Sequence, residues 1–157
     1  MVRAAIAGIA GRMGSRIAQL IGETEGIELA AGFEHPDHPR IGKDISEVTG
    51  GAPSGLLVAG TIQAVLDKAD VVIDFTSAAT SLAHMEAAAN AKKPMVIGST
   101  GFSPEQMSRA RELAANFPCV LAPNMSMGVN VLFKVVADVA RLLGDDFDIE
   151  IVESHHR

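Results

Sequence analysis

Three glycines near the amino terminus have the spacing of loops that bind nucleotide phosphates. Gly8, Gly11 and Gly14 in "AIAGIAGRMGSRIAQLIG" follow a G-x-x-G-x-x-G pattern between an expected strand and an expected helix. Glycine allows a tight turn and lets main-chain amides approach a pyrophosphate, whose charge is stabilised at the N-terminus of the helix. Ala10 stands where the usual G-x-G-x-x-G has its second glycine. By themselves, these glycines fit a tight turn without a ligand equally well.

A carboxylate follows at the distance expected of a ribose-binding residue. Glu34 ends the second apolar run, 20 residues after Gly14, where dinucleotide-binding proteins place an acid that bonds the adenosine ribose hydroxyls. Loop and acid together favour dinucleotide binding over an isolated turn and a solvated glutamate. Methyltransferases that use S-adenosylmethionine also pair a glycine loop with such an acid, although the wide glycine spacing disfavours them.

Small and hydroxyl-bearing residues follow three later apolar runs, in the segments 74–77 ("DFTS"), 98–102 ("GSTGF") and 122–130 ("APNMSMGVN"). In open α/β sheets, ligands gather at the carboxyl ends of the strands. For any single residue, ordinary helix capping by Ser77, Ser103 or Ser126 is the better interpretation. Three such loops on one rim of a sheet nevertheless favour a binding site.

The other candidate groups predict no metal site. His35 and His38 flank Asp37 in "HPDH", but the neighbouring prolines and the lack of a partner cluster favour a solvated loop. His84 lies within a helical pattern and is interpreted as a surface or packing histidine. The single cysteine, Cys119, excludes an internal disulfide and favours a small buried thiol.

Apolar runs alternate with helical patterns, which predicts an α/β fold with a Rossmann-like, doubly wound parallel sheet. The runs are rich in Val, Ile, Leu and Ala, as strands covered on both faces are. Residues 35–55 are expected to form a long surface loop. Strands are expected at 2–8, 27–33, 56–60, 70–75, 94–98, 119–123 and 147–154, and helices at 12–24, 62–68, 78–92, 104–117 and 128–143.

Composition narrows the class of protein. The chain has 157 residues, of which 48% are hydrophobic and 20% charged, as in a globular protein. A formal net charge of -6 argues against a nucleic-acid binder. The apolar runs are too short to cross a membrane, and the amino terminus lacks the form of a signal peptide, so a cytoplasmic protein without membrane contact is expected.

The pattern changes towards the end of the chain. Residues 1–127 are expected to form a dinucleotide-binding Rossmann domain. The apolar helix at 128–143 leads into a strand that no helix follows, so residues 128–157 are expected to begin a second, α+β substrate and oligomerisation domain that is cut short.

These motifs occur together in a known family. "AGIAGRMG", Glu34, "VIDFT", "VIGSTGF", "NMSMGVN" and "EIVESHH" have the order and spacing found in bacterial 4-hydroxy-tetrahydrodipicolinate reductases, also called dihydrodipicolinate reductases. The sequence resembles this family over its whole length. The most specific motif, E-[IV]-x-E-x-H, is matched by Glu150, Ile151, Glu153 and His155.

The resemblance implies transfer of a hydride from NADH or NADPH to a cyclic, unsaturated dicarboxylate in lysine (diaminopimelate) biosynthesis, and a homotetramer for the full-length family. It assigns His155 as the acid/base group, for which a histidine suits neutral pH, and His156 as a ligand of a substrate carboxylate. It assigns pyrophosphate, ribose and nicotinamide contacts to Gly8, Ile9, Ala10, Gly11, Arg12, Met13, Glu34, His35, Gly98, Ser99, Thr100, Ala122, Pro123, Asn124 and Met125.

The sequence departs from the family pattern in two places, which affect the expected cofactor preference and the expected activity. His35 stands where the family often has an arginine for the 2'-phosphate of NADPH, and histidine is a weaker, pH-dependent donor, so a preference for NADH or dual use is expected. The family's H-x-x-x-K lysine and Ser-Gly-Thr substrate loop would follow Arg157. The chain is therefore expected to be a fragment that binds cofactor with little or no turnover; the alternative is a non-catalytic dinucleotide-binding module.

Overall fold

The computed structural model describes residues 1–50 and 52–152, and the chain divides into two units. The first unit comprises Met1–Pro123, and the second begins at Asn124.

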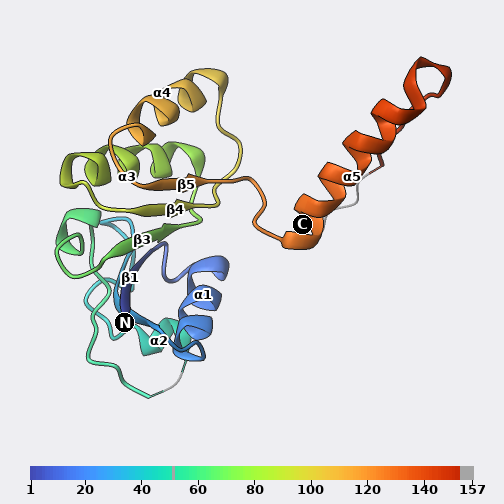
Figure 1. Cartoon of the computed structure of the whole chain (residues 1–157). Coiled ribbons are helices and arrows are strands. Elements are labelled where there is room, and N and C mark those ends of the chain that lie inside the picture. The colour runs from blue at the N-terminus through green and yellow to red at the C-terminus, as the bar shows by residue number, and fades with distance from the viewer. Residues whose placement is uncertain (51, 153–157) are drawn as a thin grey trace. The chain divides into compact units, whose positions relative to one another are not determined.

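A five-stranded parallel sheet forms the centre of the first unit (Figure 1). Its strands lie in the order β2-β1-β3-β4-β5, which reverses direction between β1 and β3. Such a reversal opens a crevice at the carboxyl ends of the strands, where doubly wound folds bind their ligands. The predicted Rossmann-like fold is confirmed. The strands are β1 (Val2–Ala7), β2 (Ile27–Phe33), β3 (Val71–Asp74), β4 (Met95–Ile97) and β5 (Cys119–Leu121).

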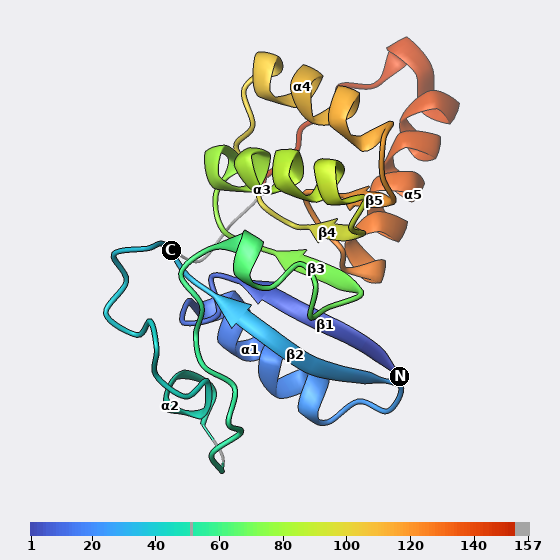
Figure 2. The same ribbon diagram turned by 90° about the vertical axis from the view of Figure 1, so that its left-hand side faces the viewer.

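Helices cover both faces of this sheet (Figures 1 and 2). On β1, Ala4 and Ile6 pack into the hydrophobic cluster that includes residues of α1, whereas Ala5 and Ala7 pack into the cluster that includes residues of α3 and α4. This alternation follows from the two-residue period of a strand. One face carries α1 (Arg12–Gly22) and α2 (Ser46–Thr49), and the other carries α3 (Ala78–Ala91), α4 (Pro104–Ala114) and the 3-10 turn η1 (Ile62–Ala64).

Three serines begin helices, as the capping interpretation predicts. Ser77 Oγ accepts a hydrogen bond from the Thr80 amide at 3.3 Å at the start of α3. Ser103 forms a complete capping box with Gln106 at the start of α4. Ser126 caps α5 (Met127–Leu143). In each cap the serine hydroxyl oxygen accepts a hydrogen bond from an amide of the first helical turn, which has no acceptor within the helix.

Two elements predicted in the first unit are wrong. Residues 56–60 form no strand, because their main chain divides its bonds between two neighbours: the Ala59 amide bonds Gly32 O, and the Val58 amide bonds Lys43 O. Only single bridges result. The helix predicted over 62–68 is reduced to η1. Hydrogen bonds between residues three apart, such as that from Val65 N to Ile62 O, replace the continuous series of bonds between residues four apart that an α-helix needs.

The expected long loop contains α2 and is organised by one carboxylate. Asp44 accepts hydrogen bonds from the amides of Ser46, Ser54 and Gly55 at 2.9, 3.1 and 2.7 Å. These bonds hold the pKa of Asp44 well below its usual range. Asp44 therefore holds two parts of this loop, the start of α2 and the segment at Ser54 and Gly55, close together.

The second unit contains α5 and the 3-10 turn η2 (Gly144–Asp146). The strand predicted at 147–154 is wrong for residues 147–152, which form neither helix nor strand. A strand needs a neighbour to pair with, and the described part of this unit offers a helix only. The predicted domain boundary after residue 127 and the role of residues 128–157 stay predictions.

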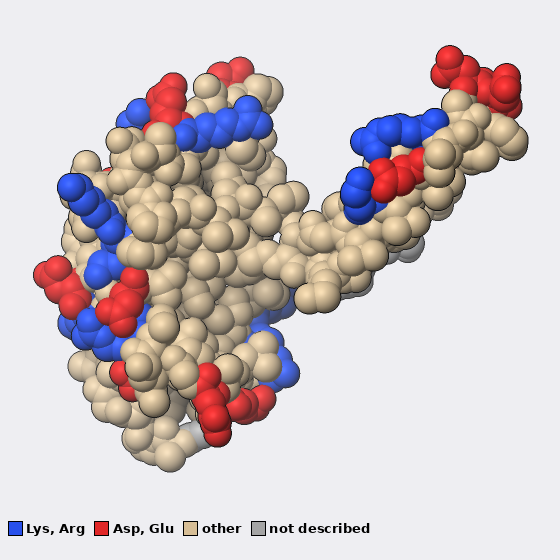
Figure 3. All heavy atoms as spheres, in the orientation of Figure 1, with Lys and Arg blue, Asp and Glu red and all other residues tan. Residues whose placement is uncertain are grey.

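Charges of both signs are interspersed on the surface drawn in Figure 3, where uncharged atoms cover most of the area. Several charged side chains of the first unit form ion pairs, including Arg3 with Asp70 at 2.8 Å and Arg109 with Glu86 at 3.3 Å. In the described ranges, no helix combines the length and the hydropathy that crossing a membrane requires.

Candidate functional site

The turn after β1 is built from glycines whose positions leave no room for a side chain. Gly8 has a φ of +65°, in the left-handed region, and a Cβ there would lie 2.9 Å from Thr76 Cγ2. A Cβ on Gly14 would overlap the carbonyl oxygen of Gly8. The first turn of α1 therefore lies directly against the loop, at the crevice between β1 and β3.

The N-terminus of α1 fits an anion. Gly11 is the N-cap and has no side chain with which to cap, and the first turn carries no acidic residue. The first amides of a helix have no partner within it and lie at the positive end of its dipole. Amides of Arg12 and Met13 are thus suited to a pyrophosphate.

Glu34 joins the end of β2 to this loop. Its Oε1 accepts a hydrogen bond of 2.7 Å from the Ala10 amide, and the Gly8 amide bonds Phe33 O at 2.9 Å. A carboxylate accepts about four hydrogen bonds in all, so Glu34 keeps acceptor capacity for ribose hydroxyls. The glycine loop and the acid, which the sequence predicts to act together, therefore meet. The cavity at this point has a volume of about 370 Å³ and is lined by Gly8, Ala10, Gly11, Arg12, Met13, Gly14, Glu34, His38, Phe75 and Thr76.

A second cavity of about 370 Å³ continues past Glu34. It lies between His35, the segment Gly60–Gln63 and the residues Thr80 and His84 of α3. The His35 side chain is 76% exposed and lies 3.6 Å from the Asp37 carboxylate. His35 is thus exposed next to Glu34, and its Nδ1 accepts a hydrogen bond of 3.4 Å from the Asp37 amide.

The predicted nicotinamide residues of the first unit lie after β4 and β5. Ser99, Thr100 and Pro123 line a cavity of about 420 Å³ beside α4. A Cβ on Gly98 would overlap the Phe75 ring, so only glycine fits there. The Ala122 amide bonds Ile97 O at 3.1 Å, which fixes the start of the segment after β5.

The remaining predicted site residues are Ile9, Asn124, Met125, His155 and His156. Asn124 and Met125 belong to the second unit, where Asn124 Oδ1 accepts a bond of 2.8 Å from the Ser126 amide. The Ile9 side chain is fully buried in the core, so Ile9 can contact a ligand only through its main chain. His155 and His156 lie outside the described residues.

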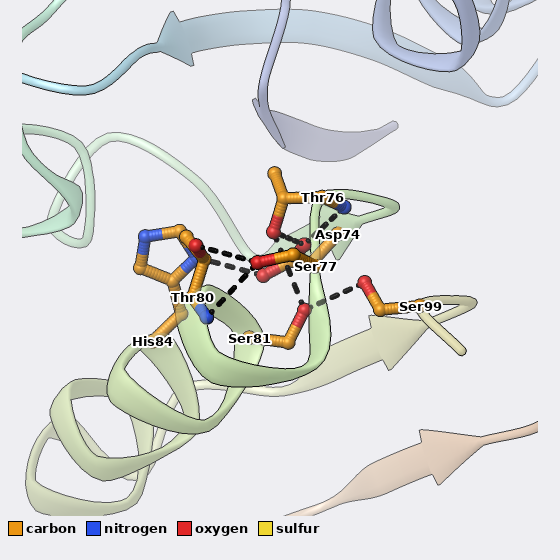
Figure 4. Close-up of polar contacts among 7 residues, drawn as sticks. All are labelled: Asp74, Thr76, Ser77, Thr80, Ser81, His84 and Ser99. Carbon is orange, nitrogen blue, oxygen red and sulfur yellow. Dashed lines mark hydrogen bonds and ion pairs between the residues drawn. The ribbon is translucent and has the colours of Figure 1, made fainter. Parts of the chain in front are cut away.

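Asp74 begins the segment 74–77, but the sequence motifs indicate no role of its own for it; Figure 4 shows it among the polar side chains of α3 and of the segment after β4. Asp74, at the end of β3, is fully buried and accepts bonds of 2.9 and 2.7 Å from the Thr76 amide and hydroxyl. Its Oδ2 lies 2.7 Å from His84 Nδ1. Burial raises the pKa of Asp74, but the hydrogen bonds from His84 and Thr76 outweigh burial and leave it below its usual range.

His84 is thus more than a surface or packing residue. Its ring packs edge-to-face on Phe33, with centroids 5.0 Å apart, and the side chain is 15% exposed. The signal in the sequence was the spacing of Ser77, Ser81 and His84, at i, i+4 and i+7, which places three polar residues on one helix face.

Residues 2–125 match a family model described as the N-terminus of dihydrodipicolinate reductase. The chain belongs to the dihydrodipicolinate reductase family. It is 66% identical to the 4-hydroxy-tetrahydrodipicolinate reductase of Syntrophobacter fumaroxidans over 157 residues, which are 100% of this chain and 59% of that protein. It is 50% identical, with the same coverage, to the reductase of the same name from Geobacter sp. strain M21.

A solved structure agrees with this membership in the dihydrodipicolinate reductase family. Dipicolinate-bound dihydrodipicolinate reductase from Paenisporosarcina sp. TG-14 has a TM-score of 0.71 and 28% identity, covering 88% of this chain and 53% of that one. The chain spans about 59% of the length of the curated relatives that it matches.

The Asp74 interactions predict an acid dependence for this family member. The folded state lowers the pKa of Asp74, so the ionised Asp74 carboxylate stabilises the fold at pH values above the ordinary carboxyl pKa. This contribution to stability is lost as the pH falls through the pKa of Asp74 in the folded protein. At neutral pH, Asp74→Asn should lower the free energy of unfolding by about 2–3 kcal/mol, since its amide leaves a donor unsatisfied. Urea unfolding at pH 7 and pH 3 should show a smaller difference between variant and wild type at pH 3; an equal difference would contradict the prediction.

Proposed function

We propose that this protein reduces 4-hydroxy-tetrahydrodipicolinate to tetrahydrodipicolinate with NADH or NADPH, in diaminopimelate and lysine biosynthesis. The observation that carries the proposal is the 66% identity to a reductase of that name along the whole chain. The contact between Ala10 and Glu34 supports the cofactor half of the proposal, because it brings a phosphate-binding loop and a ribose-binding acid together.

The residues of the first unit fit a dinucleotide. Amides of Arg12 and Met13 would bind the pyrophosphate, Glu34 would accept bonds from the ribose hydroxyls, and Gly98–Thr100 would line the nicotinamide side together with Ala122 and Pro123. When bound, the cofactor supplies the hydride. The glycine loop would hold that cofactor at the crevice between β1 and β3.

The catalytic part of the proposal rests on the motif E-[IV]-x-E-x-H. In it, His155 provides the proton and His156 binds a substrate carboxylate. The solved reductase from Paenisporosarcina sp. TG-14 is bound to dipicolinate, a cyclic dicarboxylate, which supports a dicarboxylate as the substrate class here. Residues 128–157 would begin the substrate domain of a cytoplasmic homotetramer.

A fluorescence titration with NADH tests the cofactor half. The chain has no Trp and no Tyr, so protein emission interferes little. We expect saturable NADH binding that S-adenosylmethionine does not displace, and little or no oxidation of NADH on addition of substrate. Displacement by S-adenosylmethionine would favour a methyltransferase. Little or no turnover is the expected result both for a part of the reductase and for a non-catalytic module, whereas a rate typical of enzymes would exclude the module and show that the chain suffices for catalysis.

Replacing His35 tests the cofactor preference. We expect wild type to bind NADH at least as well as NADPH, and His35→Arg to tighten NADPH binding about tenfold, because guanidinium bonds a phosphate in two places. NADH affinity should change less than about threefold. His35→Gln, which adds no charge, is the control. Wild type that prefers NADPH at neutral pH would contradict the prediction.

A further inference from the structure

The buried polar side chains of the described residues are gathered in one cluster. Asp74 and Ser81 are fully buried, and Ser99 is 4% exposed. They come from β3, α3 and the segment after β4, and Figure 4 shows them beside one another with Thr76 and His84. Buried hydroxyls cost free energy unless they are hydrogen-bonded. The other buried residues of α3 include Ala78, Met85 and Ala88, so an alanine would satisfy packing at position 81.

The hydrogen bonds within the cluster have a defined direction. Thr76 donates its hydroxyl hydrogen to Asp74 Oδ1, since a carboxylate only accepts. In the long contact of 3.4 Å between Thr76 and Ser81, Ser81 is then the donor. Ser99 must therefore donate in its bond of 2.7 Å to Ser81. This last bond joins α3 directly to the segment after β4.

The two ends of this row of hydrogen bonds lie at the two ends of the cofactor site. Thr76 lies beside Gly8 and lines the cavities on the side of the phosphate loop and of Glu34. Ser99 lies between Gly98 and Thr100 and lines the cavity beside α4. Ser81 lines none of these cavities and acts only through its neighbours.

We propose that Ser81 is a positioning residue, which through its bond to Ser99 holds the Gly98–Thr100 segment in place for the nicotinamide half of the cofactor. The inference rests on the proposed cofactor function. A change at Ser81 should therefore affect the two halves of the cofactor differently. The adenosine half would contact Glu34 and the glycine loop, whose hydrogen bonds do not involve Ser81. The nicotinamide half would contact the Gly98–Thr100 segment, which Ser81 holds.

Two ligands distinguish this role from a general loss of structure. We expect Ser81→Ala to weaken NADH binding roughly tenfold, the effect of a buried hydroxyl left without its partner. Binding of ADP-ribose, which lacks nicotinamide, should change less than about twofold. The emission of bound NADH should also change, because its nicotinamide loses a fixed environment. Ser108→Ala, an exposed serine in α4, is the control for serine replacement within a helix.

Ser99→Ala provides a second variant for the same bond. It should give the same selective loss, and the double variant should be no weaker than either single one, because both remove one interaction. The inference is wrong if Ser81→Ala leaves NADH affinity unchanged or weakens NADH and ADP-ribose equally. Wild type that binds neither ligand would overturn the cofactor function itself, which is a different result.

Discussion

Gly14→Ala is expected to weaken NADH binding by at least about 100-fold, the loss of two charge-assisted hydrogen bonds. The added methyl group would overlap Gly8 O and lie 2.8 and 2.9 Å from Gly8 C and Ile9 Cα, all of them main-chain atoms. Main chain cannot move aside as a flexible side chain can. The first turn of α1 must therefore shift away from the loop, so that its amides no longer point at the expected position of the pyrophosphate.

The same helix supplies the matched control for this variant. Gly22 also lies in α1, and a Cβ there would meet nothing within 4 Å. Gly22→Ala should leave NADH binding unchanged and should keep or raise stability, by up to about 1 kcal/mol. Gly14→Ala should instead lower the free energy of unfolding by about 1–3 kcal/mol. Isothermal titration and urea unfolding measure both, and normal NADH affinity in Gly14→Ala would contradict the role given to the loop.

Glu34→Gln is expected to weaken NADH binding by about 10- to 100-fold, because a charged acceptor of ribose hydroxyls becomes neutral. The glutamine carbonyl can still accept from the Ala10 amide, so the loop should keep its shape. NADPH should lose less affinity than NADH, since the removed carboxylate would repel a 2'-phosphate. The ratio of the two dissociation constants is therefore the informative readout.

Glu28→Gln is the control for charge on the same strand. Glu28 is exposed and pairs in register with Arg3, at the end of β2 opposite to Glu34. Its replacement should change neither dissociation constant by more than about twofold. If Glu34→Gln weakens NADH no more than Glu28→Gln does, Glu34 does not bind the ribose.

Local patterns were sufficient to predict the parts of the site that lie close together in sequence. The glycines of the loop, the strand before them and the helix after them occupy one continuous segment, so their spacing alone indicates the turn. Glu34 could be added because the β1–α1–β2 unit has a nearly constant length in dinucleotide-binding folds. The capping serines Ser77 and Ser103 were likewise predicted from their immediate neighbours.

Predictions failed where partners distant in sequence decide the structure. The apolar run at 56–60 has a composition suited to a strand, yet its amides bond both Gly32 and Lys43. Residues 147–151 alternate apolar and acidic side chains, which also favours a strand, but the described part of their unit offers no strand with which to pair. Strand formation depends on a neighbour, and a local pattern does not say whether one is available.

The sequence by itself determined the doubly wound fold, the glycine turn after the first strand, the position of Glu34 at the end of the second strand, and the family, because all of these are encoded in local spacing and in motifs. Only the tertiary structure decided that the Glu34 carboxylate bonds the Ala10 amide, and that Asp74, Ser81, His84 and Ser99 share one buried cluster. Parallel strands bring their carboxyl ends to one rim whatever their separation along the chain. Which polar groups meet there is set by strand order and register, and not by the residues beside them in sequence.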